Sequence, residues 1–345
     1  MKLKPAISKM ARFFTLILFV LIVNTVFAQL GGESTYEFLN LPNSARMAAL
    51  GGNQVAIYDP TDLNVAYNNP AMLHPDMDKR LLMNYVGYLG DIKFGYASYA
   101  KDYEEIGTFA LGMHYINYGE FDYAEPNGQR NGTFNAAEYA LNIIWSKQFG
   151  KIRTGATLKP VLSSFEAYQS FGVALDLGAA YVSDDELTSF GFVLKNMGTQ
   201  ITTYYENGER ESLPFDVQFG ISKKLAHAPA RLTATMQHLQ DWDLKPKELQ
   251  EDGSTTIVET DEGFGKQFLR HLVLGVELLP SPNFTVRAGY NYQRRQELVF
   301  DDKASTVGFS WGFGFKVNRF HFNYGSARYH LAATSNHISV AINLN

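Results

Sequence analysis

The sequence predicts an all-β protein, a transmembrane antiparallel β-barrel of about 14 strands with an N-terminal hatch (plug) segment. Three observations predict this class. Bulky apolar residues alternate with small or polar ones, the gaps between such segments alternate between short and long, and the first residues are typical of an export signal. We therefore divide the 345 residues into a signal peptide (1–28), a hatch (29–80) and an outer-membrane β-barrel (81–345).

The N-terminus has the composition of a cleavable signal. A cationic start precedes the apolar run Phe13–Val23, and Val26-Phe27-Ala28 fits a small-residue cleavage site. The apolar run is shorter than the roughly 20 residues of a spanning helix, so a transmembrane anchor is the less favoured alternative. We expect an exported protein that resides in the cell outer membrane.

The composition excludes several classes of function. The chain has no cysteine, which excludes disulfides, thiolate metal sites and cysteine nucleophiles. Its formal net charge is −5 and it has no basic cluster, so we expect no nucleic-acid partner. Aromatic residues make up 14% of the chain, which is typical of aromatic strands facing a lipid bilayer. We expect no cofactor.

Residues 29–80 do not show the alternation of strands. Ser44–Leu50 is a helix candidate, with Ser44 as its N-cap and Gly51-Gly52 as its end. Asp59-Pro60 and Asn69-Pro70 are turn signals. Such a segment fits a small cap, a periplasmic tail or a plug. A barrel of this width has an open lumen unless something fills it, so we favour the plug.

Alternation is clearest in residues 306–317. One face carries bulky apolar side chains and the other carries small or polar ones: Val307, Phe309, Trp311, Phe313, Phe315 and Val317 against Gly308, Ser310, Gly312, Gly314 and Lys316. Successive strand side chains point to opposite faces, so this pattern places the bulky row toward lipid and the small row toward a lumen.

Similar alternation predicts fourteen strands in all. Their expected ranges are 81–89, 92–100, 107–117, 138–148, 152–163, 170–182, 188–196, 215–223, 230–240, 270–279, 283–293, 306–317, 320–327 and 337–344. The longest gaps (118–137, 197–214, 241–269 and 294–305) are separated by short turns, as expected of outer loops and periplasmic turns. An even strand count places both ends of the barrel in the periplasm.

The motifs that suggest chemistry are weak. Gly308-Phe309-Ser310-Trp311-Gly312 matches the hydrolase pattern G-x-S-x-G, but that motif requires a strand-to-helix turn, and here the strand continues. The eight histidines are scattered, so we predict no metal site. We predict no catalytic residue and no enzyme.

Two further features each leave two interpretations open. Four cations either line a selectivity zone or, as we favour, pair with carboxylates of the plug or the wall: Arg46, Arg231, Arg287 and Lys316. Lys159-Pro160 in the fifth strand marks either a kinked wall opening or, as we favour, a bulge without function, because proline removes a ladder hydrogen bond.

The hatch resembles a known family. Tyr36–Pro42 and Asp62–Leu73 resemble the PorV/PorQ group, the FadL-like outer-membrane barrels of the Bacteroidetes type IX secretion system. The Asn-Pro-Ala element also resembles the hatch of FadL-type transporters, and the resemblance implies a fourteen-stranded barrel. The hatch motif comprises Ser44, Arg46, Gly51, Gly52, Asn69, Pro70 and Ala71.

The resemblance implies a non-enzymatic component of the type IX attachment complex, in which secreted cargo is processed and attached to the cell surface. The partners that the resemblance implies are the outer-membrane lipid and a PorZ-like surface protein, with PorU and PorV in the same complex. It also implies one copy of this chain in each complex. The partner-binding residues are unknown, but geometry favours the loops 118–137, 197–214 and 241–269. The alternative is a FadL-like transporter of hydrophobic or small organic compounds. The chain departs from many outer-membrane barrels by ending in Asn343-Leu344-Asn345 rather than an aromatic residue.

Overall fold

A computed structural model describes residues 34–124, 129–206, 208–244, 247–249, 255–257, 263–297, 306–330 and 333–344. The predicted signal peptide lies outside the described residues, as do residues 29–33 of the predicted hatch. No helix within these ranges is long and apolar enough to cross a membrane.

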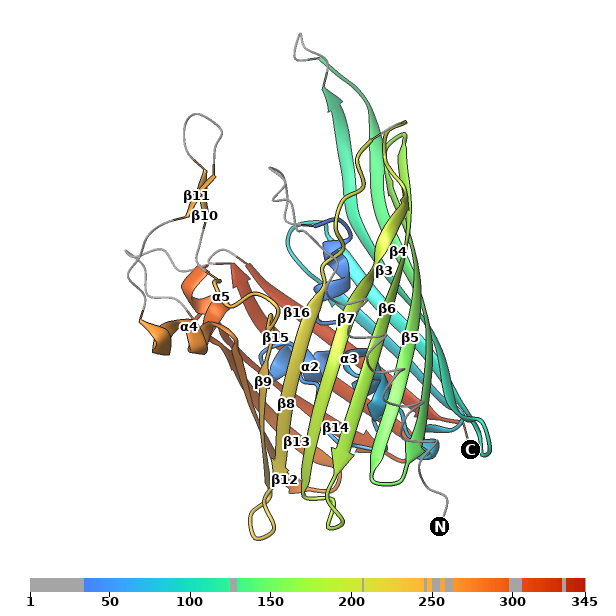
Figure 1. The fold of residues 1–345 in the computed structure, drawn as a ribbon, viewed down its shortest axis with the longest axis vertical. Coiled ribbons are helices and arrows are strands. Elements are labelled where there is room, and N and C mark those ends of the chain that lie inside the picture. Colours follow the sequence, from blue (N-terminus) through green and yellow to red (C-terminus); the bar gives the residue numbers. More distant parts are fainter. Residues whose placement is uncertain are drawn as a thin grey trace, which may run out of the picture.

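Fourteen strands form one closed antiparallel barrel, which confirms the predicted barrel and its strand number (Figure 1). The strands are β1 (Arg80–Gly87), β2 (Lys93–Tyr103), β3 (Gly107–Ala124), β4 (Arg130–Phe149), β5 (Ile152–Phe165), β6 (Tyr168–Val182), β7 (Thr188–Thr202), β8 (Asp216–Lys224), β9 (Ala230–Met236), β12 (Leu272–Ser281), β13 (Phe284–Asn291), β14 (Phe309–Val317), β15 (Phe320–His330) and β16 (Ala333–Asn343). Pairing of β1 with β16 closes the ring, so no strand of the barrel is left with an open edge.

The wall has an apolar outer face. In β14, Phe309 and Trp311 are each 55% exposed, whereas Ser310 between them is 4% exposed. The same outward rows continue around the barrel, for example at Leu111, Leu158, Leu177, Phe219, Leu274 and Ile338. A soluble protein does not leave so continuous an apolar surface in water, so this belt is the face expected of a barrel that lies in lipid.

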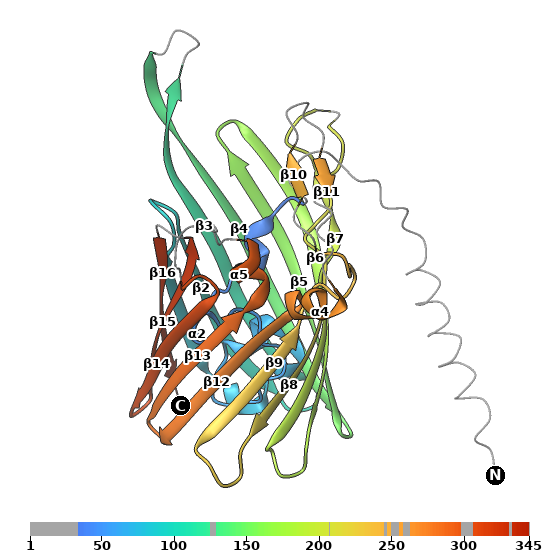
Figure 2. The same cartoon turned by 90° about the vertical axis from the view of Figure 1, so that its left-hand side faces the viewer.

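Residues 34–79 lie inside the barrel and are mostly buried (Figures 1 and 2). They form η1 (Glu37–Asn40), α2 (Ala45–Ala49), α3 (Val65–Asn68), η2 (Pro70–Met72) and η3 (Pro75–Met77). The helix α2 packs against β13 to β16, and η2 packs against β4 to β6. Residues 34–79, called the plug below, therefore contact two separate parts of the barrel wall.

The sequence explains where α2 begins and ends. Ser44 Oγ accepts a hydrogen bond from Met47 N at 3.3 Å, as an N-cap does. Gly51 and Gly52 follow with φ of 94° and 124°, values that favour glycine. The wall is also shaped for close contact, because a Cβ at Gly289 would lie 2.1 Å from Gly51 N. Glycine at that wall position lets the backbone of the plug approach.

The main departures from the predicted strands lie in the long gaps. The gap 118–137 is largely strand, since β3 continues to Ala124 and β4 begins at Arg130, and this hairpin extends well beyond the neighbouring strands (Figure 1). The gap 241–269 contains the short hairpin β10 (Lys247–Leu249) and β11 (Thr255–Ile257) and most of α4 (Phe264–Arg270). The strand predicted at 283–293 ends at Asn291, where α5 (Tyr292–Glu297) begins. In the projecting part of β3 and β4 both faces are exposed, so the sequence there lacks the one-sided pattern of a wall strand.

Candidate functional site

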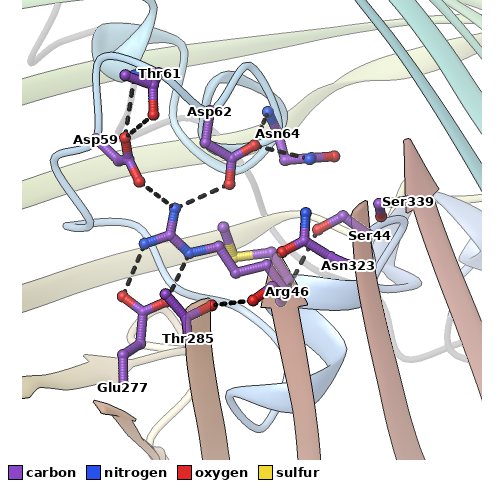
Figure 3. A network of polar contacts seen from close by, with 12 residues as sticks. Ser44, Arg46, Asp59, Thr61, Asp62, Asn64, Glu277, Thr285, Asn323 and Ser339 are labelled. Atoms are coloured by element: carbon purple, nitrogen blue, oxygen red, sulfur yellow. Dashed lines mark hydrogen bonds and ion pairs between the residues drawn. The ribbon is translucent and has the colours of Figure 1, made fainter. Parts of the chain in front are cut away.

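A buried ion-pair network joins the plug to the wall (Figure 3). Arg46 of α2 binds Glu277 of β12 with two parallel bonds, Nε to Oε1 at 2.9 Å and Nη2 to Oε2 at 2.7 Å. Its remaining terminal nitrogen, Nη1, contacts Asp59 Oδ2 at 2.8 Å and Asp62 Oδ2 at 2.9 Å. One guanidinium therefore ties two parts of the plug to one wall strand.

Glu277 is the centre of this network. It is 0% exposed and receives two wall arginines besides Arg46, Arg231 Nη1 at 2.8 Å and Arg287 Nε at 2.8 Å. Both arginines sit opposite Glu277 in the ladder, Arg231 on β9 and Arg287 on β13. Three cations and three carboxylates, counting Asp59 and Asp62, are balanced. Balanced, fully bonded charges avoid the penalty of an unpaired buried ion.

Of the two interpretations of the four cations, pairing holds for three, because Arg46, Arg231 and Arg287 all contact Glu277. Lys316 instead donates to Thr61 Oγ1 of the plug at 3.2 Å. Burial raises the pKa of Asp59, but the adjacent Arg46 guanidinium outweighs this effect, so the carboxyl pKa lies well below its usual value. Asp59 is thus charged at neutral pH.

The Asn-Pro-Ala element fixes the other side of the plug. Asn69 Oδ1 accepts from Ala71 N at 3.0 Å, while Asn69 Nδ2 donates to Val55 O at 2.9 Å. Pro70 begins η2, which lies against the glycines of β5 and β6; a Cβ at Gly155 would lie 2.4 Å from Pro70 C. The hatch motif thus divides into two contact regions, one around Arg46 and one around Asn69.

A second buried charged cluster lies in the wall between β5 and β7. Lys159 Nζ contacts Asp176 Oδ2 at 2.6 Å and Asn196 Oδ1 at 2.9 Å. Lys195, one residue before Asn196, is also buried. The plug residue Tyr67 lies beside both lysines, with its ring centroid 5.7 Å from Lys159 Nζ and 5.8 Å from Lys195 Nζ.

Two irregularities in the strands meet at this cluster. The β4–β5 ladder runs from Ala140↔Val161 directly to Ile143↔Leu158, so Lys159 and Pro160 make no pair with β4, although both pair with β6. The β6–β7 ladder has a bulge that sets two residues of β7 opposite Asp176. A bulge redirects side chains, and here it turns the consecutive Lys195 and Asn196 both inward.

Ser310 is no nucleophile in this structure. Its hydroxyl is buried and donates to Ala49 O of the plug at 3.1 Å. No group of three or more metal-ligating side chains gathers within the described ranges. An open pocket of about 550 Å³, lined by residues such as Gln169, Tyr204, Tyr205 and Arg210, lies at the end of β7.

Known structures share the fold. The toluene transporter TodX of Pseudomonas putida superposes with a TM-score of 0.53 at 13% identity, covering 88% of this chain and 99% of that chain. A second crystal structure of TodX gives a TM-score of 0.51 at 13% identity, covering 87% and 96%. A FadL homologue of Pseudomonas aeruginosa gives a TM-score of 0.48 at 12% identity, covering 88% of this chain and 98% of that chain. No family model matches the sequence, and no curated protein does. The likeness is therefore one of fold, to the TodX barrel.

Sequence reasoning missed the two wall carboxylates at the centres of these clusters. Glu277 stands between Val276 and Leu278 as an ordinary inward polar residue. Only the register reveals that arginines flank it on both neighbouring strands. The sequence singled out Lys159-Pro160, but not the bulge that brings Lys195 to the same place.

Proposed function

We propose that the protein passes small hydrophobic compounds across the outer membrane, the alternative that the sequence left open. The observation that carries the proposal is the interrupted β4–β5 ladder at Pro160. The plug is fixed to the wall on both sides, so a route along the barrel axis would have to break the Arg46 network. A route through the wall needs only a local separation of strands that already lack hydrogen bonds at this point. The fold shared with a toluene transporter supports this proposal.

Restoring the ladder should slow transport. In Pro160→Val the backbone regains an N–H that can pair with β4, and valine is favoured in strands. We expect toluene uptake into proteoliposomes to fall several-fold while the barrel stays folded and heat-modifiable on gels. Pro282→Ala, in the turn between β12 and β13, is the matched control and should leave uptake unchanged. Undiminished uptake by a folded Pro160→Val barrel would refute the wall route.

A specific observation also favours a second function, anchoring of a surface partner. The β3–β4 hairpin projects beyond the other strands and exposes Phe121 and Tyr123, which are 43% and 39% exposed (Figure 1). Exposed aromatic residues on a projecting element are typical of protein contacts. In this proposal a PorZ-like protein binds the hairpin within a type IX attachment complex, with PorU and PorV beside it.

Shortening the hairpin separates the two functions. A variant that joins Asn117 to Ala136 through a two-residue turn removes the projection and leaves the wall part of β3 and β4 paired. We expect it to lose co-purification of the surface partner from native membranes while retaining toluene uptake. A partner that still co-purifies in stoichiometric amount would contradict the hairpin as its anchor.

A further inference from the structure

The helix α4 carries an exposed apolar cluster, called the α4 cluster below, that comprises Trp242, Phe264 and Leu269. Phe264 is 72% exposed, more than any other large apolar residue of the described ranges. Trp242 stacks on its ring with centroids 5.6 Å apart and is itself 40% exposed, and Leu269 is 39% exposed. Both views place α4 at the side of the barrel, toward the end from which the β3–β4 hairpin projects (Figures 1 and 2). Water is a poor neighbour for so much apolar surface.

Several contacts hold the α4 cluster in place. Trp242 stacks on His271 as well as on Phe264, with ring centroids 4.7 Å apart in the His271 pair. His271 is fully buried directly before β12, and its Nε2 lies 3.3 Å from Trp242 O. Gln267 Nε2 of α4 donates to Asp243 Oδ1 at 2.9 Å. These contacts join α4 to the chain on both sides of it and fix the stacked rings as one surface.

The α4 cluster continues the lipid-facing surface of the wall. In β12 the outward residues Leu274, Val276 and Leu278 are 41%, 38% and 49% exposed. The helix ends at Arg270, two residues before β12 begins, and Arg270 itself is buried. The apolar surface therefore passes from β12 to Leu269 of α4 without an exposed charge between them in the sequence.

The wall is shortest beside this cluster. The strand β9, which pairs with β12, has 7 residues, the fewest of the barrel strands. At about 3.3 Å per residue and a tilt of about 40°, it covers roughly 18 Å of membrane thickness, whereas the apolar band of an outer-membrane barrel is about 25 Å tall. β9 ends at Met236 on the side of the hairpin, and the chain that follows carries Trp242. The missing height therefore falls where the α4 cluster lies.

We propose that the α4 cluster inserts into the bilayer leaflet at the hairpin end of the barrel, at the boundary between acyl chains and headgroups. The occupant of this surface is lipid, because the cluster is continuous with the belt that faces lipid. Aromatic side chains are enriched at this boundary, where the ring lies among acyl chains and a polar group such as the Trp242 N–H stays near water. Lys266, exposed on the same helix, supplies a cation for lipid phosphate groups. This inference is independent of which compound the barrel passes.

A single cysteine tests the insertion, because the chain has no cysteine of its own. Phe264→Cys and the matched control Phe121→Cys, on the projecting part of β3, are reconstituted as full mature chains in phosphatidylcholine vesicles and treated with a membrane-impermeant maleimide. Phe121 is 43% exposed and Phe264 is 72% exposed, so exposure alone predicts faster labelling at position 264. Insertion predicts the reverse, with labelling at position 264 about tenfold slower, since a thiol among acyl chains does not ionise.

Two features of this comparison make its outcome decisive. Both positions lie toward the same end of the barrel, so the direction of reconstitution affects them equally (Figure 1). The vesicles contain no second protein, so protection of position 264 comes from lipid. Labelling at position 264 that is as fast as at position 121, or faster, would overturn the proposal.

The depth of Trp242 gives an independent measurement that leaves the α4 cluster unaltered. The double variant Trp145→Phe/Trp311→Phe keeps Trp242 as its only tryptophan. Bromine near the headgroup end of the acyl chains should quench its fluorescence more than bromine near the bilayer centre. The control Trp145→Phe/Trp242→Phe keeps only Trp311, which is 55% exposed on the lipid face of β14 and reports that the brominated lipids reach the barrel. Quenching of Trp242 by aqueous iodide and by neither lipid would overturn the proposal and leave this surface to a protein partner. Stronger quenching from the bilayer centre would overturn it as well.

Discussion

Replacing Arg46 by methionine should loosen the plug while leaving the barrel closed. Arg46 is 3% exposed and supplies every plug-to-Glu277 ion pair described here. Glu277 keeps Arg231 and Arg287 in the variant, whereas Asp59 and Asp62 both lose their guanidinium. Removing one partner from a buried, hydrogen-bonded pair costs roughly 3–5 kcal/mol. Because each 1.4 kcal/mol is a factor of ten, plug opening should become about 140- to 3,700-fold more populated.

Hydrogen exchange of the α2 amides measures this population directly. We expect the amides of Ala48 and Leu50 to exchange faster by that factor, and the amides of the wall strands to keep their protection. Planar bilayers should then show ion conductance in the variant above that of the unaltered protein. Arg130→Met is the control, since its pair with Asp122 is exposed and such pairs contribute little. Acceleration of less than tenfold at α2 would refute the view that this network holds the plug.

Three further outcomes follow from the same contacts. Gly289→Ala places a Cβ 2.1 Å from Gly51 N and should speed hydrogen exchange of the α2 amides. Gly87→Ala, where a Cβ meets nothing within 4 Å, should leave that exchange unchanged. Equal exchange rates in the two variants would contradict close packing of the plug backbone on the wall at Gly289. The lowered pKa of Asp59 means that its carboxylate stabilises the plug above the unfolded value of about 4 and that this contribution is lost as the pH falls further. Plug exchange, corrected for its intrinsic rate, should therefore accelerate below about pH 4, and Asp59→Asn should weaken that acid dependence; an identical profile would sink the assignment. Ser310→Ala should leave lipid release in a lipase assay unchanged, and a drop would revive the hydrolase motif.

The barrel was predictable because its two environments differ so strongly. In residues 309–317 each side chain faces either lipid or the lumen. The alternation of bulky apolar and small or polar residues in the sequence therefore predicts which side chains face outward. Where both faces meet solvent, as in the projecting part of β3 and β4, the alternation is lost, and the sequence predicts a loop in place of the strands. The end of α2 was predictable for a different reason, because Ser44 and Gly51 act through local hydrogen bonding and backbone conformation.

The site was less predictable because it depends on register. Arg46 was recognised as a cation that pairs, but its partner Glu277 lies 231 positions away in sequence. Strand alternation tells which face a residue occupies and does not tell which residue lies opposite. The bulge at Asp176 is a still weaker signal, since one extra residue in β7 leaves the apolar rows on both sides intact. Buried charge clusters between strands are therefore found only once the ladders are known.

The two contact regions differ in what must be broken before a compound can pass. Withdrawing α2 would separate Arg46 from three carboxylates at once, at a cost of several kcal/mol. Separating β4 from β5 near Pro160 starts where two pairs are already unmade, so fewer ladder bonds have to be broken there than elsewhere along the two strands. Each further bond broken in lipid costs several kcal/mol because no water replaces it, and a hydrophobic compound can offset that cost by contact with the apolar belt outside. It gains nothing from the charges around Glu277, which would make an axial route for such a compound the poorer choice.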